Sequence, residues 1–178
     1  MTEETAPQES PEAFDLDAWL TDAKRPERSV TVYKRADLIA DLDELERKID
    51  NEARAAADEE SLSGGAQSLE AEYHAKLQQF HESALTIRVR GLTQDEMSSI
   101  HAEGKKAKEN QEQIGRRLIE AALVYPRIDV NGLERLSKAI GDAQMNEIVN
   151  AYQLATMKAP VVTVPFSLRS SGRDDTEV

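Results

Sequence analysis

Residues 25–49 read RPERSVTVYKRADLIADLDELERKI, and the apolar period of this stretch changes halfway along it. Within it, SVTVY (residues 29–33) alternates β-branched and polar side chains, which predicts a half-buried β-strand. Immediately afterwards the apolar positions follow helical spacing, at Leu38, Leu42, Leu45 and Ile49. This spacing predicts an amphipathic helix whose first turn Asp37 is placed to cap.

The same change recurs about fifty residues later, in SALTIRVRGLTQDEM (residues 83–97). Here residues 85–89 alternate as a second strand and Thr93 and Glu96 form a capping box for the next helix. Between the two strands, SLSGGAQS (residues 61–68) interrupts the helical pattern with two adjacent glycines, at which we expect the chain to turn. A second arm follows, with one apolar face formed by Leu69, Tyr73, Leu77 and Phe80.

A helix that goes out, turns and returns forms an antiparallel hairpin, with arms about 30 Å long for about 20 residues each. The entering and leaving strands then lie side by side and can pair in opposite directions. Downstream, further short helices are predicted up to Lys108, up to Tyr125, from Asn131 to Gly141 and from Asp142. We therefore predict a mainly α fold: an antiparallel helical hairpin on a small two-stranded antiparallel β ribbon, plus a C-terminal bundle of short helices.

The chain is predicted to divide into four segments. They are a disordered acidic tail (1–13), a unit of docking segment, strand, hairpin and strand (14–91), a C-terminal helical subdomain (92–160) and an extended, flexible tail (161–178). The first is rich in Pro, Glu, Ser and Thr, and Pro165 interrupts the apolar run of the last.

The bulk composition excludes several functional classes. The net charge of −12 repels nucleic acid at long range, although residues 23–35 are locally basic. The chain has no cysteine, no apolar run of the roughly 20 residues that cross a bilayer, and no signal-peptide pattern at its start. With aromatic residues at 4%, only thin helical seams are expected. We expect a cytosolic protein that binds neither nucleic acid nor membrane.

Catalytic and metal-binding patterns find little support. His74 and His81 are seven residues apart, whereas paired helical ligands need a spacing of three or four. Neither a phosphate-cradling glycine loop nor a nucleophile elbow occurs. The abundant carboxylates lie on a highly charged helix, where both members of a pair stay ionised. We expect no enzymatic activity, no cofactor and no metal.

A binding surface is what remains, and two groups of apolar residues are candidates for it. One is the acidic segment AFDLDAWL (residues 13–20), which holds the single Trp. The candidate partner-binding residues are Phe14, Leu16, Trp19, Leu20, Leu38, Leu42, Leu45 and Ile49. For both groups the alternative is internal packing: the first would cap the protein's own core, and the second would form the seam of the hairpin.

The order of the motifs resembles the tail assembly chaperones of long-tailed (siphovirus-type) phages of actinobacteria. The similar blocks are FDLDAWL, PERSVTVYKRADLIADLDELERKI, TIRVRGLTQDE, IGRRLIEAALVYPRID, GLERLSKAIGDAQMNEIVNAYQLA and VPFS, which together span residues 14–167. The helical insert and residues 105–113 contribute little to the resemblance.

The resemblance implies a chaperone in the cytoplasm of the infected host, absent from the mature virion. Such chaperones coat the tape measure protein in many copies until tail tube subunits displace them. The implied partners are the tape measure protein, other copies of the chain, a longer frameshift product and the major tail tube protein. The alternative function is a non-enzymatic acidic coiled-coil adaptor or a DNA mimic that binds a basic regulator.

Overall fold

The computed structural model describes residues 14–58 and 64–160. Its helices are α1 (Leu16–Leu20), α2 (Leu38–Asp58), α3 (Gly64–Glu82), α4 (Gln94–Lys106), α5 (Gln111–Ala122) and α6 (Val130–Met157). Its strands are β1 (Glu27–Tyr33), β2 (Ala84–Arg90) and β3 (Leu123–Tyr125). The predicted mainly α fold with a small β ribbon is confirmed. The predicted tails, 1–13 and 161–178, lie outside the described residues.

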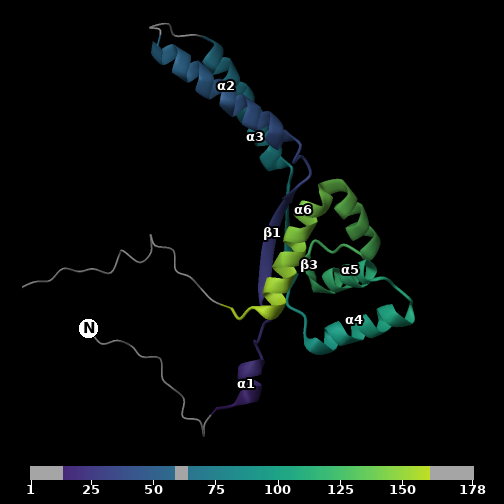
Figure 1. The fold of residues 1–178 in the computed structure, drawn as a ribbon. Helices are drawn as coiled ribbons and strands as arrows, with labels where there is room; N and C mark the ends of the chain where they lie inside the picture. The colour runs from purple at the N-terminus through teal and green to yellow at the C-terminus, as the bar shows by residue number, and fades with distance from the viewer. Residues whose placement is uncertain (1–13, 59–63, 161–178) are drawn as a thin grey trace, which may run out of the picture.

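A long two-stranded ribbon forms the axis of the molecule (Figure 1). β1 pairs with β2 in antiparallel register, from Glu27 opposite Arg90 to Tyr33 opposite Ala84. The structure therefore pairs the two strands that the sequence predicted, with the helical hairpin as their connection. Side chains alternate across the ribbon: Val32, Ile87 and Val89 are buried on one face, while the other face is polar and exposed.

The hairpin of α2 and α3 projects from one end of this ribbon (Figure 1). At its base the rings of Tyr33 and Phe80 stack with centroids 4.2 Å apart, and Lys76 of α3 binds Asp41 of α2 at 2.8 Å. The glycines expected in the turn, Gly64 and Gly65, instead begin α3, and residues 59–63 lie outside the described part. The entropic cost of glycine applies to helix interiors, so it does not exclude these two residues from a first turn.

The sheet has a third strand that the sequence analysis missed. We predicted one helix up to Tyr125, but α5 ends at Ala122 and residues Leu123–Tyr125 pair antiparallel with β2. The apolar stripe of α5 continues in phase through Tyr125, so helical periodicity alone gave no reason to stop. Pairing with Val89 buries Leu123 against the ribbon, and this tertiary contact outweighs local propensity.

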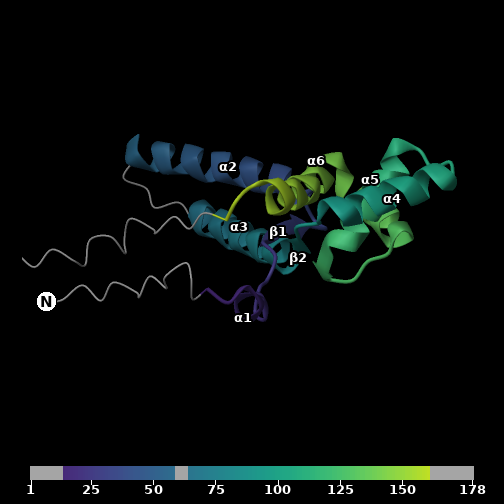
Figure 2. The same cartoon turned by 90° about the horizontal axis from the view of Figure 1, so that it is seen from below.

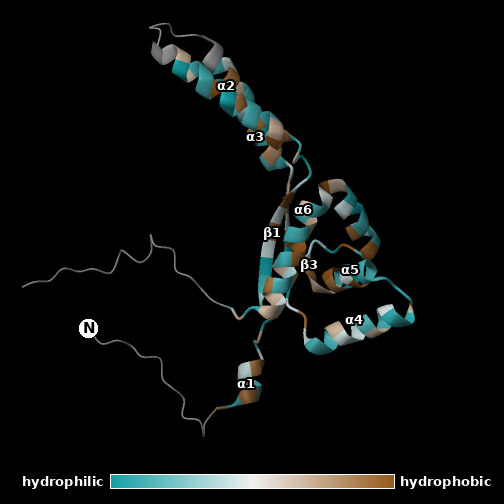
Figure 3. Cartoon of the chain, in the orientation of Figure 1, coloured by the Kyte–Doolittle hydropathy of each residue, from teal (hydrophilic) through white to brown (hydrophobic). Residues whose placement is uncertain are grey.

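The core lies between the apolar face of the ribbon and α5 and α6, as two views of the molecule agree (Figures 1 and 2). The largest fully buried side chains are Ile87, Leu123, Leu133, Ile148, Val32 and Val89. α6 packs close enough that a Cβ on Gly91 would lie 2.5 Å from the carbonyl oxygen of Ala155. The brown, apolar segments gather at this junction, whereas teal, polar residues dominate the hairpin (Figure 3).

The C-terminal helices carry the predicted start and stop signals. Thr93 and Glu96 form both bonds of the capping box that opens α4. Gly141 was predicted to end one helix before another begins, and it interrupts α6 with a φ of 80°. Asp37, predicted to cap α2, instead accepts three hydrogen bonds from the side chain of Arg35, the shortest at 2.8 Å to each carboxylate oxygen.

Candidate partner-binding surfaces

The short helix α1 presents one of the two predicted groups to solvent. Asp15 caps it by accepting a hydrogen bond from the amide of Ala18 at 3.1 Å. Every residue from Phe14 to Leu20 is exposed, and 64% of Trp19 remains accessible. α1 lies at the end of the ribbon opposite the hairpin (Figure 1). The structure thus leaves these apolar side chains free to contact a partner.

The second predicted group lies inside the hairpin. Leu38, Leu42 and Leu45 are buried and Ile49 is partly buried. They face α3, whose own stripe of Leu69, Tyr73, Leu77 and Phe80 is partly buried in turn. In the folded chain this stripe packs against α3, as the alternative interpretation proposed. A partner would therefore reach it only if the hairpin opened.

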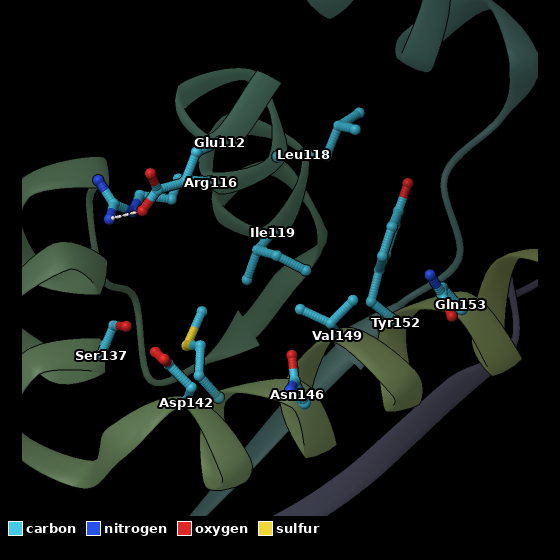
Figure 4. A pocket seen from close by; sticks show the side chains of 12 residues that line it. Glu112, Arg116, Leu118, Ile119, Ser137, Asp142, Asn146, Val149, Tyr152 and Gln153 are labelled. Atoms are coloured by element: carbon cyan, nitrogen blue, oxygen red, sulfur yellow. Dashed lines mark hydrogen bonds and ion pairs between the residues drawn. The ribbon is translucent and has the colours of Figure 1, made fainter. Parts of the chain in front are cut away.

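A third surface, which the sequence analysis did not single out, is a groove between α5 and α6. Its volume is about 370 Å³, and its lining is Glu112, Gly115, Arg116, Leu118, Ile119, Ser137, Asp142, Met145, Asn146, Val149, Tyr152 and Gln153. Figure 4 shows Ile119, Val149 and Tyr152 around its apolar floor. We call it the α5–α6 groove.

Local sequence fixes both walls of the groove. Asn110 and Gln113 form a capping box that sets the start of α5, and the apolar residues of α5 recur every three to four positions from Ile114. The break at Gly141 starts the second half of α6, which carries Met145, Val149 and Tyr152 on one side. Gly115 leaves open space because nothing lies within 4 Å of the position of a Cβ there.

The rim of the groove carries an ion pair and the carboxylate of Asp142. Arg116 binds Glu112 at 2.5 Å and approaches Glu134 at 3.7 Å. Burial raises the pKa of Tyr152 above its usual value, so its hydroxyl stays protonated and remains a hydrogen-bond donor at neutral pH. An apolar floor with a polar rim suits one or two large apolar side chains from a partner.

The groove is lined by more than apolar side chains. It also holds the ion pair of Arg116 with Glu112 and the polar side chains of Ser137, Asp142, Asn146 and Gln153. Within residues 14–58 and 64–160 there is no group of three or more His, Asp or Glu side chains that could hold a metal ion. In the same residues, no helix is both long and apolar enough to cross a membrane.

The most perturbed carboxyl group of the described chain serves the fold. The pKa of Glu96 is lowered to about 2, first by the backbone amide of Thr93 and then by the guanidinium of Arg25. The contact to Arg25 connects the segment before β1 to the start of α4. Glu96 therefore fixes where α4 leaves the ribbon.

The residues of the groove were visible in the sequence only as two helical faces. Each face was predicted separately, through Ile114 and Leu118 on one helix and Met145 and Val149 on the other. The width of these apolar faces was a signal in the sequence, because each is wider than the area that one neighbouring helix covers. The crossing of the two helices, which creates the hollow, follows from tertiary packing.

Comparison with known proteins adds no relative. No family model, no curated protein and no solved structure matches this chain.

Proposed function

We propose that this protein is a phage tail assembly chaperone that coats the tape measure protein and keeps it soluble until tail tube subunits polymerise around it. The observation that carries the proposal is that one chain presents two separate apolar surfaces, a groove and an exposed short helix. A client helix with an apolar stripe offers side chains to the α5–α6 groove. Trp19 and Phe14 of α1 offer a second contact.

The two surfaces suit repeated, weak binding along one client. Each is small beside a stable interface, which buries about 1,200–2,000 Å². Many copies on one long client gain affinity through multivalency, and each copy still dissociates when a tube subunit competes. The net charge of −12 keeps such a coat soluble. The resemblance of the motif order to tail assembly chaperones supports the same role in the host cytoplasm, outside the mature virion.

Co-expression tests the proposal directly. The probe is the longest helical open reading frame downstream of this gene, followed by size-exclusion chromatography with light scattering. We expect a soluble complex of high mass with many copies of this chain per client. A client that stays insoluble while this chain elutes alone would overturn the proposal.

A second candidate, an acidic adaptor or DNA mimic, is favoured by the exposed acids of α2. Asp43, Glu46 and Asp50 are exposed on this helix, while Asp41 and Glu44 are paired with Lys76 and Lys48. Carboxylates held on a rigid helix compete with phosphates for a basic protein, and such binding weakens steeply with salt. A chaperone that covers apolar surface keeps its client between about 50 and 500 mM salt, because burial of apolar surface is not screened.

A further inference from the structure

Within the described residues one edge of the ribbon is open, and the hydrogen bonds of the ladder define which backbone groups it exposes. The amide of Lys34 bonds the carbonyl of Ser83 at 3.2 Å, and the amide of Gly91 bonds the carbonyl of Pro26 at 2.9 Å. In an antiparallel pair, residues that bond across the ladder alternate with residues that do not. The even-numbered residues of β1 therefore bond β2, and the odd-numbered ones direct their amides and carbonyls away from it.

Tyr33 demonstrates this direction. Its amide donates to Oε1 of Gln144 at 2.7 Å, and its carbonyl accepts from Nε2 of Gln144 at 2.9 Å. Gln144 belongs to α6, on the far side of β1 from β2. A single side-chain amide thus fills the position that the backbone of a neighbouring strand would occupy, and it closes one end of the edge.

Between Glu27 and Thr31, the described part of the chain places no such side chain on the edge. β1 is an outer strand in the order β1-β2-β3, and Glu27, Ser29 and Thr31 are exposed. Within residues 14–58 and 64–160, no hydrogen bond is found to the outward backbone groups of these three residues. β1 is seven residues long and contains no proline, so neither a short strand nor a proline protects this edge.

The surroundings of the edge indicate the charge of its partner. Residues 23–35 hold Lys24, Arg25, Arg28, Lys34 and Arg35 against the single acid Glu27, in a chain whose net charge is −12. Arg25 is paired with Glu96 and Arg35 with Asp37, so Lys24, Arg28 and Lys34 carry most of the positive charge of this segment. Two copies of β1 paired with each other would bring two such basic segments together. An extended segment that carries acidic residues would instead meet opposite charge.

α6, which packs against β1, carries an exposed apolar side chain. Helical periodicity places Leu154 on the side of α6 that faces away from the α5–α6 groove, roughly 80° around the helix from Gln144. Leu154 remains 37% exposed. A strand added to β1 would point every second side chain toward the side of the ribbon that α6 covers, so these positions favour apolar residues, and the acids of the segment would meet the positive charge of residues 23–35 as a whole.

We propose that the open edge of β1, at Glu27, Ser29 and Thr31, binds an extended acidic segment of a partner protein by strand addition. The inference goes beyond the proposed chaperone function, because the ligand is an extended strand rather than an apolar helix face. Backbone hydrogen bonds supply the affinity, and the basic segment 23–35 selects the charge.

The first test changes only the ligand. The probe is the peptide acetyl-Thr-Glu-Val-Glu-Val-Glu-Thr-amide, titrated into the full-length protein by calorimetry, with hydrogen exchange read at Ser29 and Thr31. We expect binding and slowed exchange at both amides. N-methylation of the Glu residues and N-methylation of the Val residues should differ at least tenfold in affinity, because only one set of amides faces β1. Equal affinities, or no binding, would overturn the proposal.

The second test changes the protein. Ser29→Pro removes an outward amide and leaves the ladder to β2 intact, so it should keep the fold and reduce peptide affinity at least tenfold. Ser29→Ala keeps the amide and should bind as the wild type does. A Ser29→Pro protein that binds normally would overturn the proposal. So would a wild-type dimer in light scattering that Ser29→Pro dissociates, since a second copy would then occupy the edge.

Discussion

Gln144 of α6 holds both backbone groups of Tyr33, accepting from its amide at 2.7 Å and donating to its carbonyl at 2.9 Å. Tyr33 in turn stacks on Phe80 at the base of the hairpin. This pair of hydrogen bonds therefore connects three parts of the molecule: the ribbon, the helix that covers it and the projecting arms.

We expect Gln144→Ala to lower the free energy of unfolding by about 1–3 kcal/mol, because two partly buried backbone groups lose their partner. Urea denaturation followed by circular dichroism measures the change. Gln153→Ala, an exposed substitution on the same helix, should stay within about 0.5 kcal/mol. Equal effects of the two substitutions would contradict the role assigned to Gln144.

The stripe of α2 should behave as core. Leu45 is 5% exposed, so Leu45→Ala should lower the free energy of unfolding by about 2–4 kcal/mol through lost burial and a residual cavity. Ile39 is exposed on the same helix and provides the matched control, with an expected change below about 1 kcal/mol for Ile39→Ala. Denaturation curves that agree for the two variants would mean that the hairpin seam is not tightly packed in solution.

Substitution of Trp19 should weaken client binding and leave the stability of the protein unchanged. Trp19→Ala removes an exposed side chain, so the free energy of unfolding should stay within about 0.5 kcal/mol. If the proposed chaperone function holds, the same substitution reduces client binding about tenfold or more, since aromatic anchors dominate such interfaces. Retention of the co-expressed client on a column measures it, and Trp19→Phe should restore most of it. A large loss of stability in Trp19→Ala would place the residue in the protein's own core instead.

The sequence predicted the ribbon and the hairpin because both follow from local periodicity and from one geometric constraint. The change from period two at Val32 to helical period at Leu38, repeated in reverse near Leu85, left few other topologies. β3 was missed because three residues, Leu123–Tyr125, are too few to show a period, and their pairing partner lies more than 30 residues away. The α5–α6 groove was missed for a related reason: its floor joins Ile119 to Val149, which only the crossing of two helices brings together.

Two glycines should respond in opposite directions to the same change. A Cβ on Gly91 would lie 2.5 Å from the backbone oxygen of Ala155, so Gly91→Ala must displace α6 from the ribbon, at a cost of about 1–3 kcal/mol. Gly115 lies inside α5 with nothing within 4 Å of a Cβ, so Gly115→Ala should stabilise the protein by about 0.5–1 kcal/mol. Thermal unfolding of the two variants against the wild type decides both. A destabilised Gly115→Ala would show that the added methyl group does not fit at this position of the groove.

Glu96 should make the stability of the protein depend on pH in the acid range. Its folded pKa is lowered to about 2 from an ordinary value of 4.5, so its contribution is fully present above pH 4.5 and is lost as the pH falls toward 2. Because the side chain is about a third exposed, screening by solvent limits the contribution to roughly 1–2 kcal/mol. Glu96→Gln keeps an oxygen for the amide of Thr93 but removes the charge, and it should flatten the pH dependence of urea midpoints between pH 4.5 and 2. Asp95→Asn removes a carboxylate from the same helical turn, and the acid-induced loss should persist in it. An unchanged pH profile in Glu96→Gln would mean that other carboxyl groups cause the acid lability and that the contact between Arg25 and Glu96 contributes little.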